Sequence, residues 1–109
     1  MGITKTDLFT EQQNELAQVC KVLGHPARIA ILQYLSSCQQ CITGAIVDEI
    51  GLAQPTISQH LRELKAIGIV QGTIEGTSVC YCINKEKWDE ISGLISGLFA
   101  DHHPDSACC

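Results

Sequence analysis

The chain has 109 residues, of which 45% are hydrophobic and 17% charged, values typical of one small folded domain rather than of a disordered segment. Its formal net charge of −5 argues against a general nucleic-acid coat, because non-specific affinity comes mainly from cations that neutralise phosphates. The sequence has no apolar run long enough to cross a bilayer and no signal-peptide pattern at its start, so we expect a cytoplasmic protein with no membrane partner.

Two helices are expected in the first third of the chain. The first, over residues 10–23, would begin at Thr10, whose hydroxyl can cap a helix N-terminus. Its apolar face would comprise Leu16, Val19, Cys20 and Leu23. Pro26 suits the first turn of a second helix over residues 26–36. Residues 37–43 are expected to form a loop that contains two cysteines.

The segment of residues 53–68 is the most informative part of the chain. The residues that recur at helical spacing, and so predict one buried stripe, are Ile57, Leu61 and Leu64. Off this stripe lie hydroxyls, an amide and cations, the groups that bond phosphate oxygens and base edges. Residues 46–50 predict a shorter helix closed by Gly51, and the two helices together would form a helix-turn-helix. The alternative is an ordinary surface helix whose polar face is only solvated.

The periodicity changes after Gly68. Residues 69–74 and 77–83 predict two short strands joined through Glu75 and Gly76, a hairpin that would form a wing. A last helix from residue 85 carries an apolar stripe too large to leave exposed on a small protein, which favours a homodimer through the first and last helices. That stripe comprises Trp88, Ile91, Leu94, Ile95, Leu98 and Phe99.

The expected architecture is therefore mainly α with a small β-hairpin wing, a winged helix-turn-helix. Residues 1–9 would be an N-terminal extension, residues 10–99 the DNA-binding and dimerisation domain, and residues 100–109 a flexible tail with cysteines and histidines.

Charge is unevenly spread along this domain. Residues 53–88 hold four cations (Arg62, Lys65, Lys85 and Lys87) against three acids (Glu63, Glu75 and Glu86), so the middle of the chain is roughly neutral to slightly basic.

Four short motifs, in this order, resemble the ArsR/SmtB family of small dimeric winged-helix repressors. They are Val-Leu-Gly-His-Pro-Ala-Arg-Ile at 22–29, Gln-Pro-Thr-Ile-Ser-Gln-His-Leu at 54–61, Ile-Gly-Ile-Val at 67–70 and Tyr-Cys-Ile-Asn at 81–84. The resemblance covers about residues 16–98. It implies binding to double-stranded operator DNA, with release when a metal, metalloid or sulfur species occupies a cysteine- or histidine-based site.

The resemblance implies that DNA is read by the second helix of the helix-turn-helix. The predicted contacts are Gln54, Thr56, Ser58, Gln59, His60, Arg62 and Lys65 on this helix, with Thr73 and Thr77 on the wing. His60 has an equally weighted alternative as a structural residue bonded within the turn.

The sensor sites known in the family do not transfer directly to this sequence. The stretch that would carry a Cys-x-Cys-x-x-Cys run is residues 42–47, which contain no cysteine. The last helix holds Asp89 and Glu90 but no histidine, which puts in doubt a zinc site of acids and histidines.

Seven cysteines remain to be explained, and in a reducing compartment they are expected to be thiols or metal ligands. Cys38 and Cys41 form a Cys-x-x-Cys, whose spacing lets both sulfurs reach one ion, and Cys108 and Cys109 lie near His102 and His103. These two pairs are the favoured ligands, because neither a polar loop nor a tail has a packing reason to carry cysteine. The less favoured candidates are Cys20, which we expect in the core, and Cys80 and Cys82, which share one strand face.

We therefore expect a repressor released by a thiophilic metalloid or metal, with arsenite favoured and cadmium or zinc as alternatives, and no metal required for folding. The nearest rival hypothesis is the same DNA-binding fold sensing oxidants or persulfides through Cys38 and Cys41. A third keeps the fold without a small-molecule ligand. More distant hypotheses are a zinc-stabilised interaction module and a thiol oxidoreductase using Cys38 and Cys41, although such enzymes place Cys-x-x-Cys after a strand, and no parallel strand pattern precedes it here.

Overall fold

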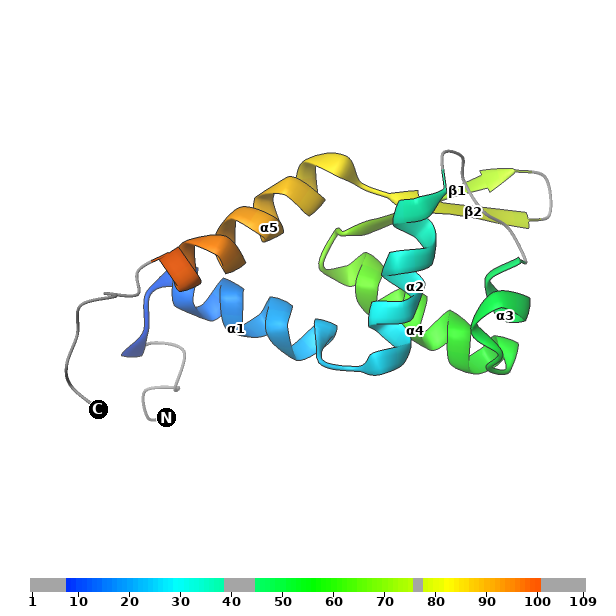
Figure 1. The fold of residues 1–109 in the computed structure, drawn as a ribbon, viewed down its shortest axis with the longest axis horizontal. Helices are drawn as coiled ribbons and strands as arrows, with labels where there is room; N and C mark the ends of the chain where they lie inside the picture. Colours follow the sequence, from blue (N-terminus) through cyan, green and yellow to red (C-terminus); the bar gives the residue numbers. More distant parts are fainter. Residues whose placement is uncertain (1–7, 39–44, 76–77, 101–109) are drawn as a thin grey trace, which may run out of the picture.

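The computed structural model describes residues 8–38, 45–75 and 78–100. Within them the chain forms α1 (Glu11–Leu23), α2 (Pro26–Ser37), α3 (Ala45–Ile50), α4 (Gln54–Ala66), β1 (Val70–Glu75), β2 (Ser78–Ile83) and α5 (Lys85–Ala100) (Figure 1). The order of elements confirms the predicted mainly α fold with a β-hairpin. None of the helices in the described ranges is both long and apolar enough to span a membrane.

Side chains at the start of α1 and α2 fix where these helices begin. Thr10 and Gln13 form a capping box, in which each side chain accepts a hydrogen bond from the other's backbone N–H at 3.0 Å. At α2, the Nδ1 atom of His25 accepts a hydrogen bond from the Ala27 N–H at 3.1 Å, and Pro26 occupies the first helical position. The predicted cap at Thr10 is confirmed, whereas capping by His25 was not expected.

The hydrophobic core lies where α1, α2, α4 and the start of β1 meet, and α3 and α5 each add one buried residue, Ile46 and Ile91. The predicted stripe of α4 is buried, and Leu64 is 0% exposed. The predicted face of α1 is wrong in one position, because Cys20 is exposed while Val19 and Val22 are buried. The buried side of α1 is set by its packing on α2, α4 and α5, and Cys20, one residue after Val19, points about 100° away from it.

The hairpin follows directly from the end of α4. Gly68 has a φ of +84°, a left-handed conformation that suits glycine, and it turns the chain from α4 into β1. The two strands are antiparallel, with Val70 opposite Ile83 and Thr73 opposite Cys80. Cys80 is buried.

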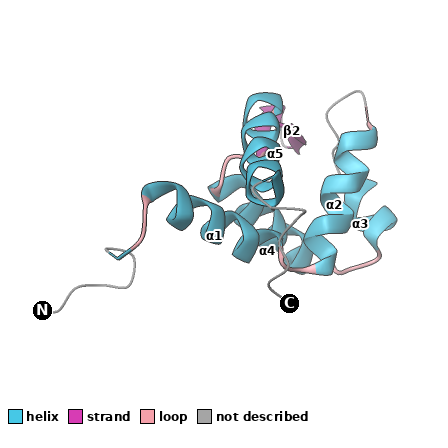
Figure 2. Ribbon diagram, turned by 60° about the vertical axis from the view of Figure 1, so that its left-hand side comes forward, coloured by secondary structure: helices cyan, strands magenta, loops and turns pink. Residues whose placement is uncertain are grey.

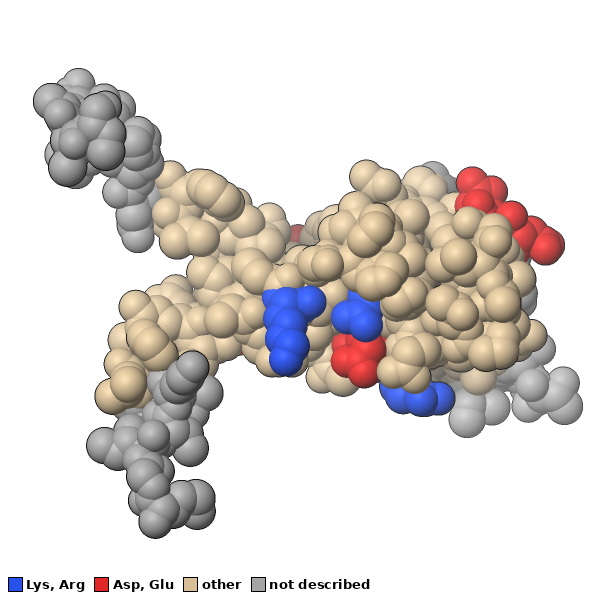
Figure 3. Space-filling view, turned by 90° about the horizontal axis from the view of Figure 1, so that it is seen from below, with Lys and Arg blue, Asp and Glu red and all other residues tan. Residues whose placement is uncertain are grey.

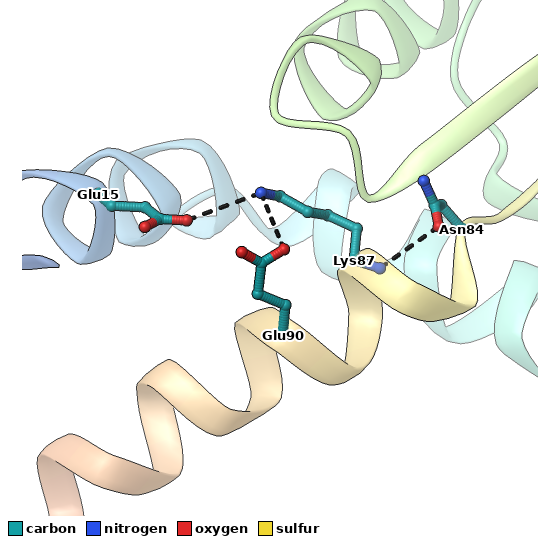
Figure 4. A network of polar contacts seen from close by, with 4 residues as sticks. All are labelled: Glu15, Asn84, Lys87 and Glu90. Carbon is teal, nitrogen blue, oxygen red and sulfur yellow. Dashed lines mark hydrogen bonds and ion pairs between the residues drawn. The ribbon is translucent and has the colours of Figure 1, made fainter.

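In Figure 1 the helices α1 and α5 extend to one side of the body formed by α2, α3, α4 and the hairpin, and Figure 2 shows that these two helices run in different directions. Lys87 joins them through its Nζ atom, which lies 3.7 Å from Glu15 on α1 and 3.2 Å from Glu90 on α5 (Figure 4). The Asn84 Oδ1 atom accepts a hydrogen bond from the Lys87 N–H at 3.3 Å and so caps α5. The stem of Lys87 covers Gly68, so α5 is also in contact with the turn that ends α4.

Candidate nucleic-acid interface

The outer face of α4 carries most of the side chains predicted to contact DNA. Of these, Gln54, Thr56, Gln59, Arg62 and Lys65 are exposed, and Ser58 is half-buried. The amphipathic pattern places them there, because Ile57, Leu61 and Leu64 occupy the opposite, buried side. An exposed row of amide, hydroxyl and cationic groups on one helix can reach base edges and phosphates in a major groove.

Two hydrogen bonds connect the polar groups at the centre of this face. The Nη1 atom of Arg62 donates to the Gln59 Oε1 atom at 3.0 Å, and the Gln59 Nε2 atom donates to the Glu63 Oε1 atom at 3.4 Å. The guanidinium and the amide are therefore held side by side in the free protein. Such pre-ordering reduces the side-chain entropy that binding would otherwise cost.

The turn that precedes α4 has the geometry of a tight helix-turn-helix connection. Gly51 has a φ of 82°, and its N–H donates to the Val47 carbonyl at 2.9 Å, which ends α3. Only three residues separate α3 from α4, in agreement with the predicted stop at Gly51.

His60 differs from its neighbours on α4 because its side chain is only 7% exposed. Its Nδ1 atom accepts a hydrogen bond from the Arg28 Nε atom at 3.1 Å, and its ring centre lies 4.4 Å from that of His25. Burial lowers the pKa of His60 below its usual value, and the nearby His25 and Arg28 lower this pKa further. This environment favours the structural role over DNA reading, with a partner on α2 rather than within the turn.

Arg28 is a residue of this region that sequence reasoning missed. Besides its bond to His60, it donates from Nη1 to the Val22 carbonyl at 3.0 Å and so joins α1, α2 and α4. The one available signal was a cation on α2 among apolar residues, flanked by Ala27 and Ile29. The Arg28–His60 contact fixes α4 against the corner between α1 and α2.

The hairpin lies beside one flank of α4. Thr73 is exposed on β1, whereas Thr77 lies outside the described residues. A Cβ atom added to Gly72 would lie 3.5 Å from the Nζ atom of Lys65, so the ammonium group of Lys65 lies against the first strand.

The predicted sensor thiols are dispersed within the described part of the chain. Cys20 is exposed on α1, Cys38 is half-buried at the end of α2, and Cys82 on β2 lies with its Sγ atom 3.6 Å from the Gln71 Nε2 atom. The described residues contain no group of three or more His, Cys, Asp or Glu side chains that could hold a metal ion. The described thiols alone therefore do not fit a closed metal site, and Cys41, Cys108, Cys109, His102 and His103 lie outside the described residues.

The charged side chains on the face of the molecule seen in Figure 3 form no continuous basic surface. Figure 3 shows basic side chains around an acidic one in the middle of the face, and a further acidic group at one end. This distribution agrees with the acidic overall charge and favours contacts at a few defined positions over general attraction to DNA.

Comparison with known proteins agrees with this geometry. Residues 25–71 match the family model described as bacterial regulatory protein, arsR family. An uncharacterized HTH-type transcriptional regulator of Methanocaldococcus jannaschii is 38% identical over 88 residues, which cover 81% of this chain and 99% of that protein. The HTH-type transcriptional repressor SmtB of Mycobacterium tuberculosis is 41% identical over 64 residues, covering 59% of this chain and 47% of that protein.

Among solved structures, a homodimeric winged helix-turn-helix DNA-binding domain from Mycobacterium bovis, a possible ArsR-family regulator, superposes with a TM-score of 0.65. It is 25% identical in sequence, and the match covers 96% of this chain and 94% of that one. The hypothesis of a thiol enzyme is thereby set aside, because the matched proteins are DNA-binding transcription regulators. The chain is a winged helix-turn-helix transcriptional regulator and belongs to the ArsR family.

Proposed function

We propose that this protein is a cytoplasmic, homodimeric repressor that binds operator DNA through the outer face of α4 and the hairpin. The observation that carries the proposal is the exposed, hydrogen-bonded pair of Arg62 and Gln59, which lies inside the segment matched by the family model. Arg and Gln side chains are those that pair with two acceptors or donors of one base edge. The relative SmtB is named a repressor, which supports repression rather than activation of transcription.

The test of DNA reading is fluorescence anisotropy on DNA from the protein's own promoter region. Each paired base contact is worth about 1–3 kcal/mol of discrimination, so Arg62→Ala with Gln59→Ala should abolish the preference for promoter over unrelated DNA. A matched control removes one cation and one glutamine at other exposed positions, Lys85 and Gln33 (Lys85→Ala with Gln33→Ala), and should keep that preference. Equal behaviour of the two double variants would overturn the proposed interface.

The homodimer is proposed from apolar side chains at the free ends of α1 and α5. Leu98 and Phe99 are 54% and 72% exposed, and Leu8 and Phe9 are also exposed. Apolar surface concentrated at one end of a small protein is typical of an interface, and two copies of α4 would then read two half-sites. Leu98→Glu with Phe99→Glu should yield monomers in sedimentation equilibrium, whereas a wild-type chain that is already monomeric would refute this part.

The proposed inducer is a thiophilic metalloid or metal, with arsenite favoured over cadmium and zinc. Its support is chemical, since seven thiols in 109 residues suit a soft ion. The candidate ligands are Cys38 with Cys41 and Cys108 with Cys109. The exposed Cys20 is a further donor, whereas the burial of Cys80 makes its thiol poorly accessible.

The inducer is tested by titrating arsenite, cadmium, zinc and a persulfide donor into the reduced protein–DNA complex. Release by arsenite that is lost in Cys38→Ser/Cys41→Ser or in Cys108→Ser/Cys109→Ser would identify both ion and ligands. Release by the persulfide donor alone would replace the proposed inducer with sulfur chemistry at the same thiols.

A further inference from the structure

A polar hollow of about 360 Å³ lies at the corner where α1, α2 and α4 meet. Its lining includes Lys21 from the last turn of α1, His25 and Arg28 from the start of α2, and Glu63 from α4. Arg28 forms part of its wall and is fixed there by its bonds to His60 and the Val22 carbonyl. The hollow thus has one cation, Arg28, held in place in its wall.

The hollow lies on the flank of α4 opposite the hairpin. Glu63 and Lys65 are two residues apart, so their side chains point about 200° apart around the helix axis. Lys65 lies against β1 at Gly72, whereas Glu63 lines the hollow. The exposed pair of Gln59 and Arg62 lies on the arc between these two flanks.

This arrangement matches the shape of a DNA major groove. A helix in that groove, which is about 12 Å wide, has a phosphate backbone on each side. With Gln59 and Arg62 directed at the bases, the hairpin would face one backbone and the hollow would face the other. Lys21 and Arg28 give the hollow two cations against the single carboxylate of Glu63.

We propose that this hollow is a second DNA-backbone site, in which Lys21 and Arg28 bind a phosphate on the side of the major groove away from the hairpin. The inference rests on the proposed DNA-binding function and extends the interface beyond the helix-turn-helix to α1 and the start of α2. Glu63 opposes the phosphate, so it limits the affinity of the site for any DNA. Phosphate contacts of this kind orient a protein without reading sequence.

The experiment measures how DNA affinity depends on salt concentration for two variants that each lose one positive charge. Lys21→Gln removes one of the two cations of the hollow and should reduce the slope of log K against log salt by about 0.9 per bound protomer, equally on promoter and unrelated DNA. Lys85→Gln is the control, because Lys85 is 88% exposed on α5, remote from the hollow, and should leave the slope unchanged. Both substitutions suit a helix, and circular dichroism checks that each variant is folded.

A second variant tests the role of the carboxylate. Glu63→Gln keeps an acceptor oxygen for the Gln59 amide but removes the negative charge, so it should tighten binding to both DNA sequences. If wild-type protein binds promoter DNA while Lys21→Gln and Lys85→Gln give the same slope, the hollow is not a phosphate site and the proposed function still stands. If the wild-type protein binds no DNA, both are wrong.

Discussion

Replacement of His60 by alanine distinguishes a structural role from a role in reading DNA. The substitution removes the acceptor for the Arg28 Nε atom at 3.1 Å and the ring that contacts His25 at 4.4 Å. A hydrogen bond to a charged group contributes about 1.5–3 kcal/mol, and we take the lower end because Arg28 is only half-buried and water can replace part of the bond. An aromatic pair adds about 0.5–1.5 kcal/mol. With some loss of buried contacts, we expect His60→Ala to lower the free energy of unfolding by about 2–4 kcal/mol.

The assay is urea unfolding followed by circular dichroism, with Gln59→Ala as the control on the same helix. Exposed substitutions of that kind change stability by less than about 0.5 kcal/mol. His60→Asn should recover part of the loss, because its amide oxygen can accept from the Arg28 guanidinium. A loss below about 0.5 kcal/mol for His60→Ala, together with a lost preference for promoter DNA in the folded variant, would refute the structural role.

The same side chain predicts how stability depends on pH. The pKa of His60 is lowered by folding, so between its folded pKa and the ordinary value near 6.5 the unfolded chain binds more protons. Stability is then fully present above the unfolded pKa and falls as the pH is lowered through the folded pKa. This part of the pH dependence should disappear in His60→Ala, and an unchanged pH profile in that variant would show that another group is responsible.

Three further predictions concern the scaffold that holds α4. Gly68→Ala should lower the free energy of unfolding by about 1–2 kcal/mol, because its φ of +84° is unfavourable for alanine. Gly93→Ala in α5 should instead raise it by about 0.5–1 kcal/mol in the monomeric chain, since no atom lies within 4 Å of the added carbon. Urea unfolding measures both changes. Leu64→Ala should cost about 2–5 kcal/mol in the same assay, since Leu64 is 0% exposed. Lys87→Gln should lower the free energy of unfolding by less than about 1 kcal/mol, and the ion-pair part of this loss should vanish in 1 M salt, because the Glu15 and Glu90 side chains are about half exposed.

The buried side and the ends of a helix could be predicted where the sequence of that helix alone carries the apolar spacing and the capping residues. The stripe of Ile57, Leu61 and Leu64 placed α4 correctly, because helical spacing alone decides which side of an amphipathic helix is buried. The caps at Thr10 and Gly51 were predictable for the same reason, since a capping contact joins neighbours in sequence. The face of α1 was less predictable, because which of Cys20 and Val22 is buried depends on the helices packed against α1.

The candidate site shows the same division between local and non-local information. His60 and Glu63 are three residues apart on α4, and both are polar, yet one is buried while the other lines the hollow. The difference arises from Arg28, which lies 32 residues before His60 in the sequence. Its guanidinium donates a hydrogen bond to the imidazole, so that the imidazole can be buried with its nitrogen satisfied. A buried histidine without such a donor would leave its nitrogen unsatisfied, so the sequence around residue 60 alone left both roles for His60 open. The Arg28 side chain that contacts His60 also lines the hollow, and therefore the candidate phosphate site depends on the packing of α1, α2 and α4 and has no signal in any one segment of the sequence.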